Sequence, residues 1–211
     1  MKFTRKEIDK LEHLKKINLI NSISGIKPAN LIGTKSDIGQ PNLAIISSVV
    51  HLGSAPPLFG FIMRPTEDVP RHTYENIKQT GYYTINHVNE SLIEKGHYTS
   101  AKFDREVSEF ERCNIEDEYL DNFHAPFVKD SSVKIGLKLV EELPIAINGT
   151  IMIIGEVQII DISDDCLMDG YHLDLSKIGG VGISGLNSYY GLNKLLDLPY
   201  ARPAETPVWD D

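Results

Sequence analysis

The residues with the clearest chemical potential follow Pro70. Proline is favoured in the first turn of a helix, so the sequence predicts a helix over 70–80 whose first turn carries Arg71, His72 and Thr73. The first N–H groups of a helix have no intrahelical partner, and the helix dipole is positive at that end. Such a turn is suited to binding an anion, and the side chains after Pro70 add further donors.

The positive charge of Arg71 supports the same interpretation. A cation is unfavourable at the positive end of a helix dipole unless an anion lies between the two. Arg64, one loop earlier in the sequence, can supply a second cation to that anion. The alternative is a solvated helix start whose charges are incidental.

A second candidate region is the stretch 42–58. An apolar run begins after Asn42 and leads directly into Ser47 and Ser48. Small hydroxyl residues at the end of a strand leave backbone N–H and C=O groups within reach of a flat ligand. The alternative is a buried strand that ends in a polar loop.

A third candidate region is the segment 97–103, which reads HYTSAKF. It is rich in hydrogen-bond donors, although surface loops often have such a composition. The seven histidines and the two cysteines show no metal-ligand spacing, and no nucleophile elbow occurs. The sequence therefore predicts no metal site and no catalytic side chain.

The segment 180–185 matches the pattern GxGxxG. A dinucleotide-binding fingerprint needs a strand before it, a helix after it and a βαβ unit around it. The preceding text is a weak strand, and only 26 residues follow. We interpret the segment as a glycine-rich loop that lets the backbone pass close to another group.

Length, composition and charge restrict the class of protein. A chain of 211 residues with 41% apolar residues can form one domain with a sizeable core. The net charge of −9 argues against nucleic acid as a partner. No apolar run approaches the roughly 18 residues of a membrane span. The start of the chain lacks a secretory apolar core, so we expect a cytoplasmic protein.

The predicted elements are mainly strands that helices interrupt irregularly. This order favours an antiparallel barrel with helices packed outside over a doubly wound fold. Helices are predicted at about 4–21, 70–80, 106–112 and 189–196, and strands at 30–35, 41–52, 58–63, 82–88, 132–142 and 150–162, with a hairpin turn at 36–39. We expect one domain over 1–211, with an N-terminal helix (about 4–21) and a C-terminal segment (about 185–211). The apolar run 151–154 predicts an interior strand.

Several segments, in their order and spacing, together resemble the flavin reductase-like family, including flavoredoxin-like flavoproteins. The resemblance covers roughly residues 24–200. It rests on KPANLIGT (27–34), NLAIISSVVHLGSAPPL (42–58), RP (64–65), RHTYENI (71–77), TGYYTINHV (80–88), HYTSAKF (97–103), SEFE (108–111) and GLNSYYGL (185–192). It implies a mainly β fold, the FMN-binding split β-barrel, which is an antiparallel Greek-key barrel with peripheral α-helices. It also implies a homodimer that holds FMN near the subunit interface.

The resemblance also implies which residues bind the cofactor. The stretch 42–49 would line the flavin ring and its ribityl chain, and the loop 97–101 would close over the flavin from the same or the neighbouring subunit. The phosphate would be held by Arg64, Arg71, His72, Thr73 and Asn76. The implied cofactor-binding residues are Asn42, Ser47, Ser48, Val49, Arg64, Arg71, His72, Thr73, Asn76, His97, Thr99, Ser100 and Ala101.

The implied activity is that of an FMN-dependent oxidoreductase of the NAD(P)H:flavin reductase type. Hydride or electrons would pass through flavin N5, so the protein supplies orientation and electrostatics rather than a catalytic side chain. The chain has no GDxH element, which the best-known reductase branch often uses at the nicotinamide. Two alternatives therefore remain, a flavoredoxin-like electron carrier that serves a redox partner protein without NAD(P)H activity, and a redox-idle flavin-binding module.

Overall fold

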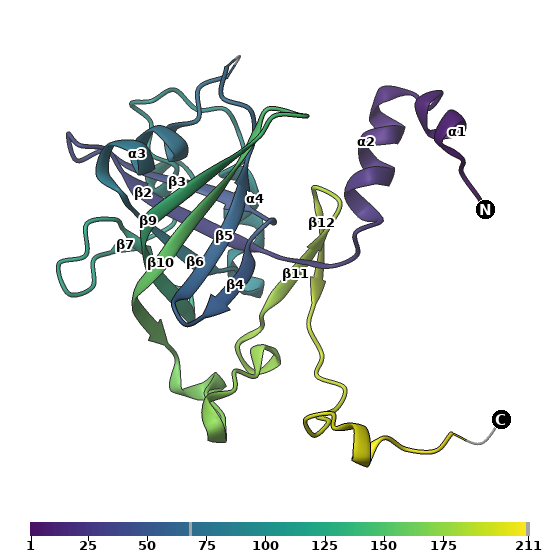
Figure 1. Ribbon diagram of the computed structural model, residues 1–211. Coiled ribbons are helices and arrows are strands. Elements are labelled where there is room, and N and C mark those ends of the chain that lie inside the picture. The colour runs from purple at the N-terminus through teal and green to yellow at the C-terminus, as the bar shows by residue number, and fades with distance from the viewer. Residues whose placement is uncertain (68, 210–211) are drawn as a thin grey trace.

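A seven-stranded antiparallel sheet, curved into an open barrel, forms the body of the protein (Figure 1). The computed structural model describes residues 1–67 and 69–209. The strand order is β3-β2-β6-β9-β10-β5-β4, so β3 and β4 are the two edges. These strands are β2 (Asn30–Lys35), β3 (Pro41–Ile46), β4 (Val50–Ser54), β5 (Pro57–Met63), β6 (Tyr82–His87), β9 (Val133–Ile145) and β10 (Thr150–Ile162).

Helices and two smaller sheets surround the barrel. The helices are α1 (Arg5–Asp9), α2 (His13–Ser22), α3 (His72–Thr80), α4 (Ile93–Tyr98) and α5 (Glu109–Arg112). The smaller sheets are β1 (Lys27–Pro28) with β11 (Val181–Ser184) and β12 (Ser188–Gly191), and β7 (Asp117–Glu118) with β8 (Phe127–Val128). Short 3₁₀ turns span Glu90–Leu92, Asp164–Cys166, Asp169–Tyr171, Leu175–Ile178 and Pro203–Glu205. Among the described residues, no helix is long and apolar enough to cross a membrane.

Strand β2 is buried on both faces, which explains why Leu31 and Ile32 are apolar at consecutive positions. Leu31 packs with one hydrophobic cluster, together with Val88 and Phe110. Ile32, the next residue, packs with a second cluster that includes Phe61. Side chains alternate between the faces of a strand, so two cores on opposite faces select apolar residues at consecutive positions.

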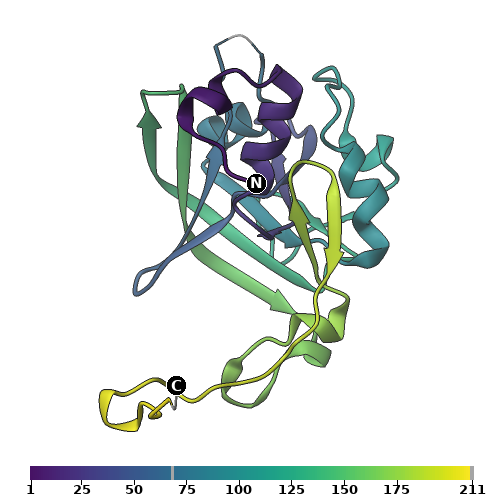
Figure 2. The same ribbon diagram turned by 90° about the vertical axis from the view of Figure 1, so that its right-hand side faces the viewer.

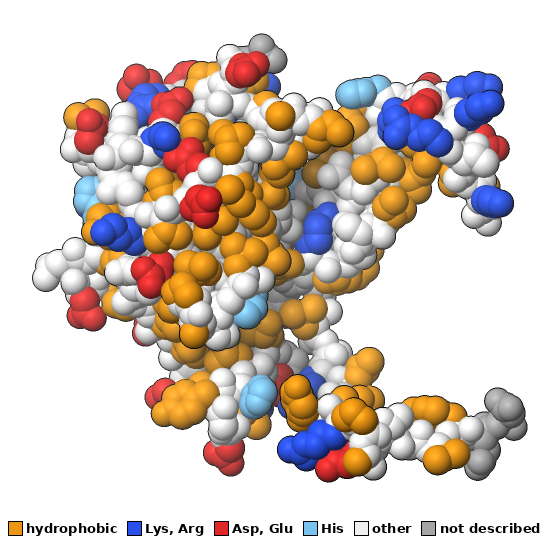
Figure 3. Space-filling view, viewed as in Figure 1, with side chains coloured by type: hydrophobic (Ala, Val, Ile, Leu, Met, Phe, Trp, Pro, Cys, Tyr) orange, Lys and Arg blue, Asp and Glu red, His pale blue; other side chains and the backbone are white. Residues whose placement is uncertain are grey.

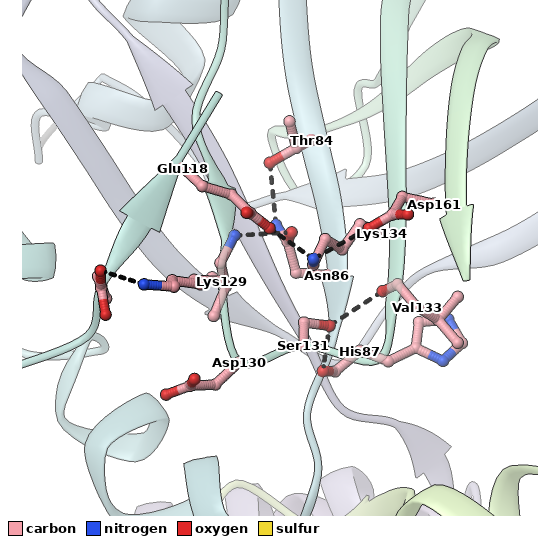
Figure 4. A network of polar contacts seen from close by, with 12 residues as sticks. Thr84, Asn86, His87, Glu118, Lys129, Asp130, Ser131, Val133, Lys134 and Asp161 are labelled. Carbon is pink, nitrogen blue, oxygen red and sulfur yellow. Dashed lines mark hydrogen bonds and ion pairs between the residues drawn. The ribbon is translucent and has the colours of Figure 1, made fainter. Parts of the chain in front are cut away.

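A polar network fastens the β7–β8 hairpin to the barrel (Figure 4). Lys134 on β9 is 8% exposed, and its Nζ donates to Glu118 Oε1 at 2.5 Å and to Asp161 Oδ2 at 3.0 Å. Asn86 Nδ2 donates to the carbonyl of Leu31 at 3.0 Å, and the Val128 N–H donates to Asn86 Oδ1 at 3.0 Å. The buried side chains of Lys134 and Asn86 therefore both have hydrogen-bond partners, as stability requires.

Several sequence predictions are confirmed. Thr4 and Glu7 form the predicted capping box, and strand 30–35 is β2 itself. The turn 36–39 joins β2 to β3 with Gly39 at φ 93°. Gly81 ends α3 in the left-handed region at φ 76°, and β10, which carries 151–154, lies between β9 and β5.

The N-terminal and C-terminal helices were predicted wrongly. The helix at 4–21 is divided into α1 and α2, and none of the residues in either is buried. Short helices are marginal without packing, so nothing enforces one continuous helix. The helix at 189–196 does not form, because Tyr189 pairs with Ile183 in the β11–β12 ladder.

Other boundaries also differ from the predictions. The strand predicted at 41–52 breaks at 47–49 into β3 and β4, and α3 starts at His72 because Arg71 has non-helical angles of φ −125° and ψ 86°. Helix α4 lies in text that was interpreted as irregular. The segment 180–185 is not a loop, because it forms strand β11, where a Cβ on Gly182 would lie 2.2 Å from Ile26 Cγ2.

Strand β6 ends in a histidine that titrates below its usual range. Burial lowers the pKa of His87 to about 4, whereas an unfolded-chain histidine titrates near 6.5. The folded state therefore holds His87 neutral, and the stability that goes with the neutral form is present above about pH 6.5 and is lost as the pH falls toward 4. We expect the free energy of unfolding to fall by about 1–2 kcal/mol between about pH 7 and pH 5, and His87→Phe to remove most of that loss. Urea unfolding at both pH values measures this, and an undiminished loss in His87→Phe would contradict the assignment.

Candidate functional site

Two arginines and a helix N-terminus meet at the start of α3. Arg71 occupies the N-cap position, and no side chain caps the helix there. Burial and the nearby positive charge of Arg64 lower the pKa of Arg71. Arg71 Nε donates to the Pro65 carbonyl at 3.3 Å, which holds the guanidinium over the loop that precedes the helix. Two like charges beside the positive end of a helix dipole form a site that an anion would stabilise.

A buried cluster of amides and hydroxyls lies next to this helix start. Asn42 Nδ2 donates to Thr73 Oγ1 at 3.0 Å and to Thr34 Oγ1 at 3.3 Å. Asn76 Nδ2 donates to the same Thr34 oxygen at 3.1 Å. All four residues are at most 7% exposed. Because the Thr73 oxygen accepts from Asn42, its hydroxyl proton is directed away from Asn42 and can serve another acceptor.

Three predicted residues, Asn42, Thr73 and Asn76, are thus brought together by the fold. Thr34 was missed as a member of this cluster. Its signal is the β2–β3 register, in which Thr34 lies opposite Asn42. That register follows from the hairpin turn at 36–39, so it could have been inferred from the sequence.

Side-chain acceptors cover the free edge of β3. The Leu43 N–H donates to Glu109 Oε2 at 3.0 Å, and the Ile45 N–H donates to Thr99 Oγ1 at 2.9 Å. Thr99 is 3% exposed, and its hydroxyl in turn donates to the Gly96 carbonyl at 2.7 Å. The loop 97–101 is therefore attached to β3, the same strand that carries Asn42.

The carboxylate of Glu109 is the least expected group in the site. It is 6% exposed, and burial raises its pKa, while the Leu43 N–H and the charge of His72 act in the opposite direction. His72 therefore lies on the Glu109 side of the helix start. The sequence motif SEFE contained this residue, but no ligand-binding role was predicted for it.

Two substitutions of Glu109 separate its role as a hydrogen-bond acceptor from the role of its charge in stability. Because burial raises the pKa of Glu109 in the folded protein, ionising this carboxyl makes the folded state less stable as the pH rises above the unfolded-state pKa. Glu109→Gln avoids this cost, so the variant should be at least as stable as the natural protein at neutral pH. Glu109→Leu leaves the Leu43 N–H unpaired and should lower the free energy of unfolding by about 1–3 kcal/mol. Urea unfolding of both variants at neutral pH checks this. A larger loss in Glu109→Gln than in Glu109→Leu would show that the charge itself is stabilising.

The hydroxyl of Ser48 ties the segment between the two edge strands, β3 and β4, to the backbone of Ile62. The Ile62 N–H donates to Ser48 Oγ at 3.0 Å, and Ser48 Oγ donates to the Ile62 carbonyl at 3.3 Å. The segment between β3 and β4 is thereby fixed to β5. Val49 packs against the barrel core, and Ser47 is half-buried. The Ser48 hydroxyl is therefore engaged within the protein.

The outer part of the loop 97–101 points toward β12. His97 Nδ1 lies 3.0 Å from Tyr189 Oη, and Ser100 Oγ donates to the His97 carbonyl at 2.7 Å. Ala101 is exposed. The predicted residues therefore form two groups, one around the start of α3 and one in this loop, joined through the contact between Thr99 and Ile45.

Solved structures with this fold include flavoproteins. A flavin-reductase-type split-barrel protein from Shewanella frigidimarina NCIMB 400 is 51% identical, with 95% of this chain and 100% of that chain covered and a TM-score of 0.92. Flavoredoxin of Desulfovibrio vulgaris (Miyazaki F) is 21% identical over 83% of this chain and 92% of that chain, with a TM-score of 0.72. An FMN-binding protein from Thermus thermophilus is 15% identical over 83% and 91% of the two chains, with a TM-score of 0.70.

These likenesses confirm the predicted fold, a mainly β antiparallel split barrel. The family model described as "Flavin reductase like domain" matches residues 26–172, which include the helix start, the β3 edge and the loop 97–101. The chain therefore belongs to the flavin reductase-like family.

Proposed function

We propose that this protein is an FMN-dependent oxidoreductase that binds the flavin phosphate at the start of α3. The observation that carries the proposal is the pairing of Arg64 and Arg71 beside an uncapped helix N-terminus. The FMN phosphate is an anion that carries nearly two charges at neutral pH, and a helix N-terminus with guanidinium donors suits it. Thr73, whose proton is free to point away from Asn42, adds a hydroxyl donor.

The rest of the proposed flavin site lies along β3 and the segment that follows it. The backbone at 47–49 would contact the ring, while Ser48 keeps that backbone fixed to β5. Asn42 would hold Thr73 in place beside the phosphate, and Asn76 would support Thr34, which accepts from the same Asn42 amide. His72 and the loop residues His97, Thr99, Ser100 and Ala101 complete the proposed site. When bound, the flavin supplies hydride or electron transfer through N5, and the protein supplies its orientation.

The electron donor in this proposal is NADH or NADPH, as in an NAD(P)H:flavin reductase. The likeness to a flavin-reductase-type protein of 51% identity supports this choice. The second candidate is an electron carrier that keeps its FMN and serves a redox partner protein. The absence of a GDxH element and the shared fold with a flavoredoxin favour that alternative.

Two measurements test the proposal in sequence. The visible spectrum of the purified protein, after addition of FMN and removal of the excess, should show flavin bands. Steady-state oxidation of NADH and NADPH, with and without added flavin, then separates the candidates. Turnover identifies a reductase, whereas retained FMN without turnover identifies a carrier. A protein that retains no flavin and shows no turnover would refute both.

We also propose that the protein functions as a homodimer. Helices α1 and α2 and the C-terminal segment extend away from the barrel on the same side (Figure 1), and α1 and α2 lie in front of the barrel when it is viewed from that side (Figure 2). Figure 3 shows a wide hollow between this arm, the barrel and the tail, with hydrophobic side chains on all three. Leu14 on α2 is 71% exposed, and Leu195 and Trp209 in the tail are 85% and 80% exposed. Apolar surface of this extent is typical of an interface.

The dimer gives a direct prediction about truncation. Removing residues 1–23 and 193–211 should leave the barrel folded, because no residue of α1 or α2 is buried and the tail is exposed. Sedimentation should give a dimer for the full chain and a lower dimer fraction for the truncated chain. A full chain that sediments as a monomer of 23.6 kDa, and still binds FMN fully, would contradict the prediction.

A further inference from the structure

A small cavity lies between the barrel and strand β11, outside the proposed phosphate site. Its volume is about 200 Å³, and Asn30 of β2 and His87 of β6 are among its lining residues. These two residues lie directly opposite each other in the antiparallel β2–β6 ladder. Directly opposed residues project from the same face of a sheet, with Cβ atoms about 4.5–5.5 Å apart. The cavity therefore receives an amide and an imidazole side by side.

The amide of Asn30 has no hydrogen-bond partner within the described part of the chain. Asn30 is 1% exposed, yet neither its Nδ2 nor its Oδ1 makes a hydrogen bond. An unpaired buried amide is costly, and buried polar groups are nearly always paired. Asn86, on the neighbouring strand, shows the usual situation, since its Nδ2 donates to two oxygens and its Oδ1 accepts one N–H. The Asn30 amide thus offers one donor edge and one acceptor to a ligand.

The imidazole of His87 is neutral near pH 7, because burial lowers its pKa to about 4. A neutral imidazole presents one N–H donor and one acceptor nitrogen. Lys27 also lines the cavity, but its Nζ donates to the carbonyls of Asn21 at 2.7 Å and Gly185 at 3.3 Å. Two donors of the Lys27 ammonium are thus engaged by backbone carbonyls, which leaves Asn30 and His87 as the neutral polar groups of the cavity.

The walls of the cavity are mainly apolar. Gly180 and Gly182 contribute backbone, and a Cβ on Gly182 would lie 2.2 Å from Ile26 Cγ2, so the missing side chains let apolar neighbours approach β11 closely. Ile26, Leu175 and Leu192 also line the cavity. Ile26 is 52% exposed and Leu192 is 38% exposed, so this side is accessible to a small molecule. Apolar walls with a few convergent polar groups are the usual composition of a ligand site.

We propose that Asn30 and His87 form a binding site for a small uncharged molecule with a primary carboxamide on an apolar body. A carboxamide presents a donor and an acceptor side by side, which match the acceptor and donor of the Asn30 amide in a cyclic pair of hydrogen bonds. His87 then has a further partner on the carboxamide. The site does not depend on the flavin, so it stands or falls separately from the proposed oxidoreductase function.

The test uses benzamide as the probe and the full-length chain. Titration followed by heteronuclear NMR should show benzamide binding that shifts the Asn30 and His87 signals, with benzoate at least tenfold weaker because a carboxylate cannot donate. Asn30→Leu should weaken benzamide binding at least tenfold. The thermal midpoint of Asn30→Leu should stay equal or rise, because the variant removes an unpaired buried amide. Asn86→Leu is the matched control and should lose stability, since its amide is fully bonded.

Four results of these measurements would each overturn the proposal. They are no benzamide binding, equal binding of benzoate and benzamide, unchanged binding in Asn30→Leu, or a loss of folding in Asn30→Leu comparable with that in Asn86→Leu. The last result would identify Asn30 as a structural amide. Asn30→Asp, which keeps the size and removes the amide donors, repeats the binding test in a second variant. A dimer structure in which a partner side chain fills the cavity would also overturn the proposal.

Discussion

Arg71→Ala is expected to weaken FMN binding by about ten- to a hundredfold, because a charge-assisted contact contributes roughly 1.5–3 kcal/mol. The whole protein carries a net charge of −9, so long-range electrostatics oppose an anionic ligand and local donors must overcome this. Arg71 is half-buried at the N-cap of α3, where its guanidinium can bind two phosphate oxygens at once. Riboflavin lacks the phosphate, so its affinity should change much less.

Titrating FMN and riboflavin into the natural protein and the variant completes a thermodynamic cycle. Arg71→Lys serves as the intermediate variant, since it keeps the charge but loses the two-pronged geometry. Arg5→Ala is the matched control, because Arg5 lies on the N-terminal arm and pairs with Asp9. An equal loss of riboflavin and FMN affinity in Arg71→Ala would mean that Arg71 is structural or contacts the ring.

The second large effect is expected at Gly33, in the middle of β2. A Cβ at this position would lie 2.3 Å from the Pro126 carbonyl oxygen and 2.5 Å from Thr84 Oγ1. Thr84 Oγ1 also donates to that same carbonyl at 2.7 Å, so displacing either atom alone would weaken this buried hydrogen bond. Overpacking of a rigid core costs typically 1–3 kcal/mol, and Gly33→Ala should lie at about 3 kcal/mol or above.

Urea or thermal unfolding of Gly33→Ala measures this loss. The matched control is Gly53→Ala on β4, where the nearest atom to an added Cβ is the Pro56 carbonyl oxygen at 3.5 Å. Gly53→Ala should change the free energy of unfolding by less than about 1 kcal/mol. Similar losses in the two variants would show that the β2–β8 approach relaxes more easily than the distances imply.

Interactions within a few residues were predictable from the sequence. The capping box of Thr4 and Glu7, the hairpin turn at 36–39 and the end of α3 at Gly81 each depend on neighbouring residues. The anion-binding role proposed for the residues after Pro70 is also a local inference, because it rests on one helix turn. The long strands were also predictable, since their alternation and apolar runs extend over many residues.

Contacts between distant parts of the chain could not be predicted from short stretches of sequence. Ser48 bonds to Ile62, fourteen positions along the chain, and this contact ends β3 inside an apolar run that looked continuous. Tyr189 lies in text that suggests a helix, but pairing with β11 makes it a strand. A segment with weak intrinsic preference takes the structure that buries it and pairs its backbone.

The candidate site likewise contains residues that the sequence identified and contacts that only the fold decided. Sequence alone identified Arg71 and Thr73 as donors at a helix start and marked 42–58 and 97–103 as candidate regions. The resemblance to a family assigned individual residues of these regions to the cofactor. The fold alone decided that Asn42 contacts Thr73 and that Glu109, 66 positions from Leu43, accepts the N–H of the β3 edge. It also left the Asn30 amide unpaired beside His87. Which distant groups meet depends on how strands pair and which faces are buried, and no short stretch of sequence contains that information.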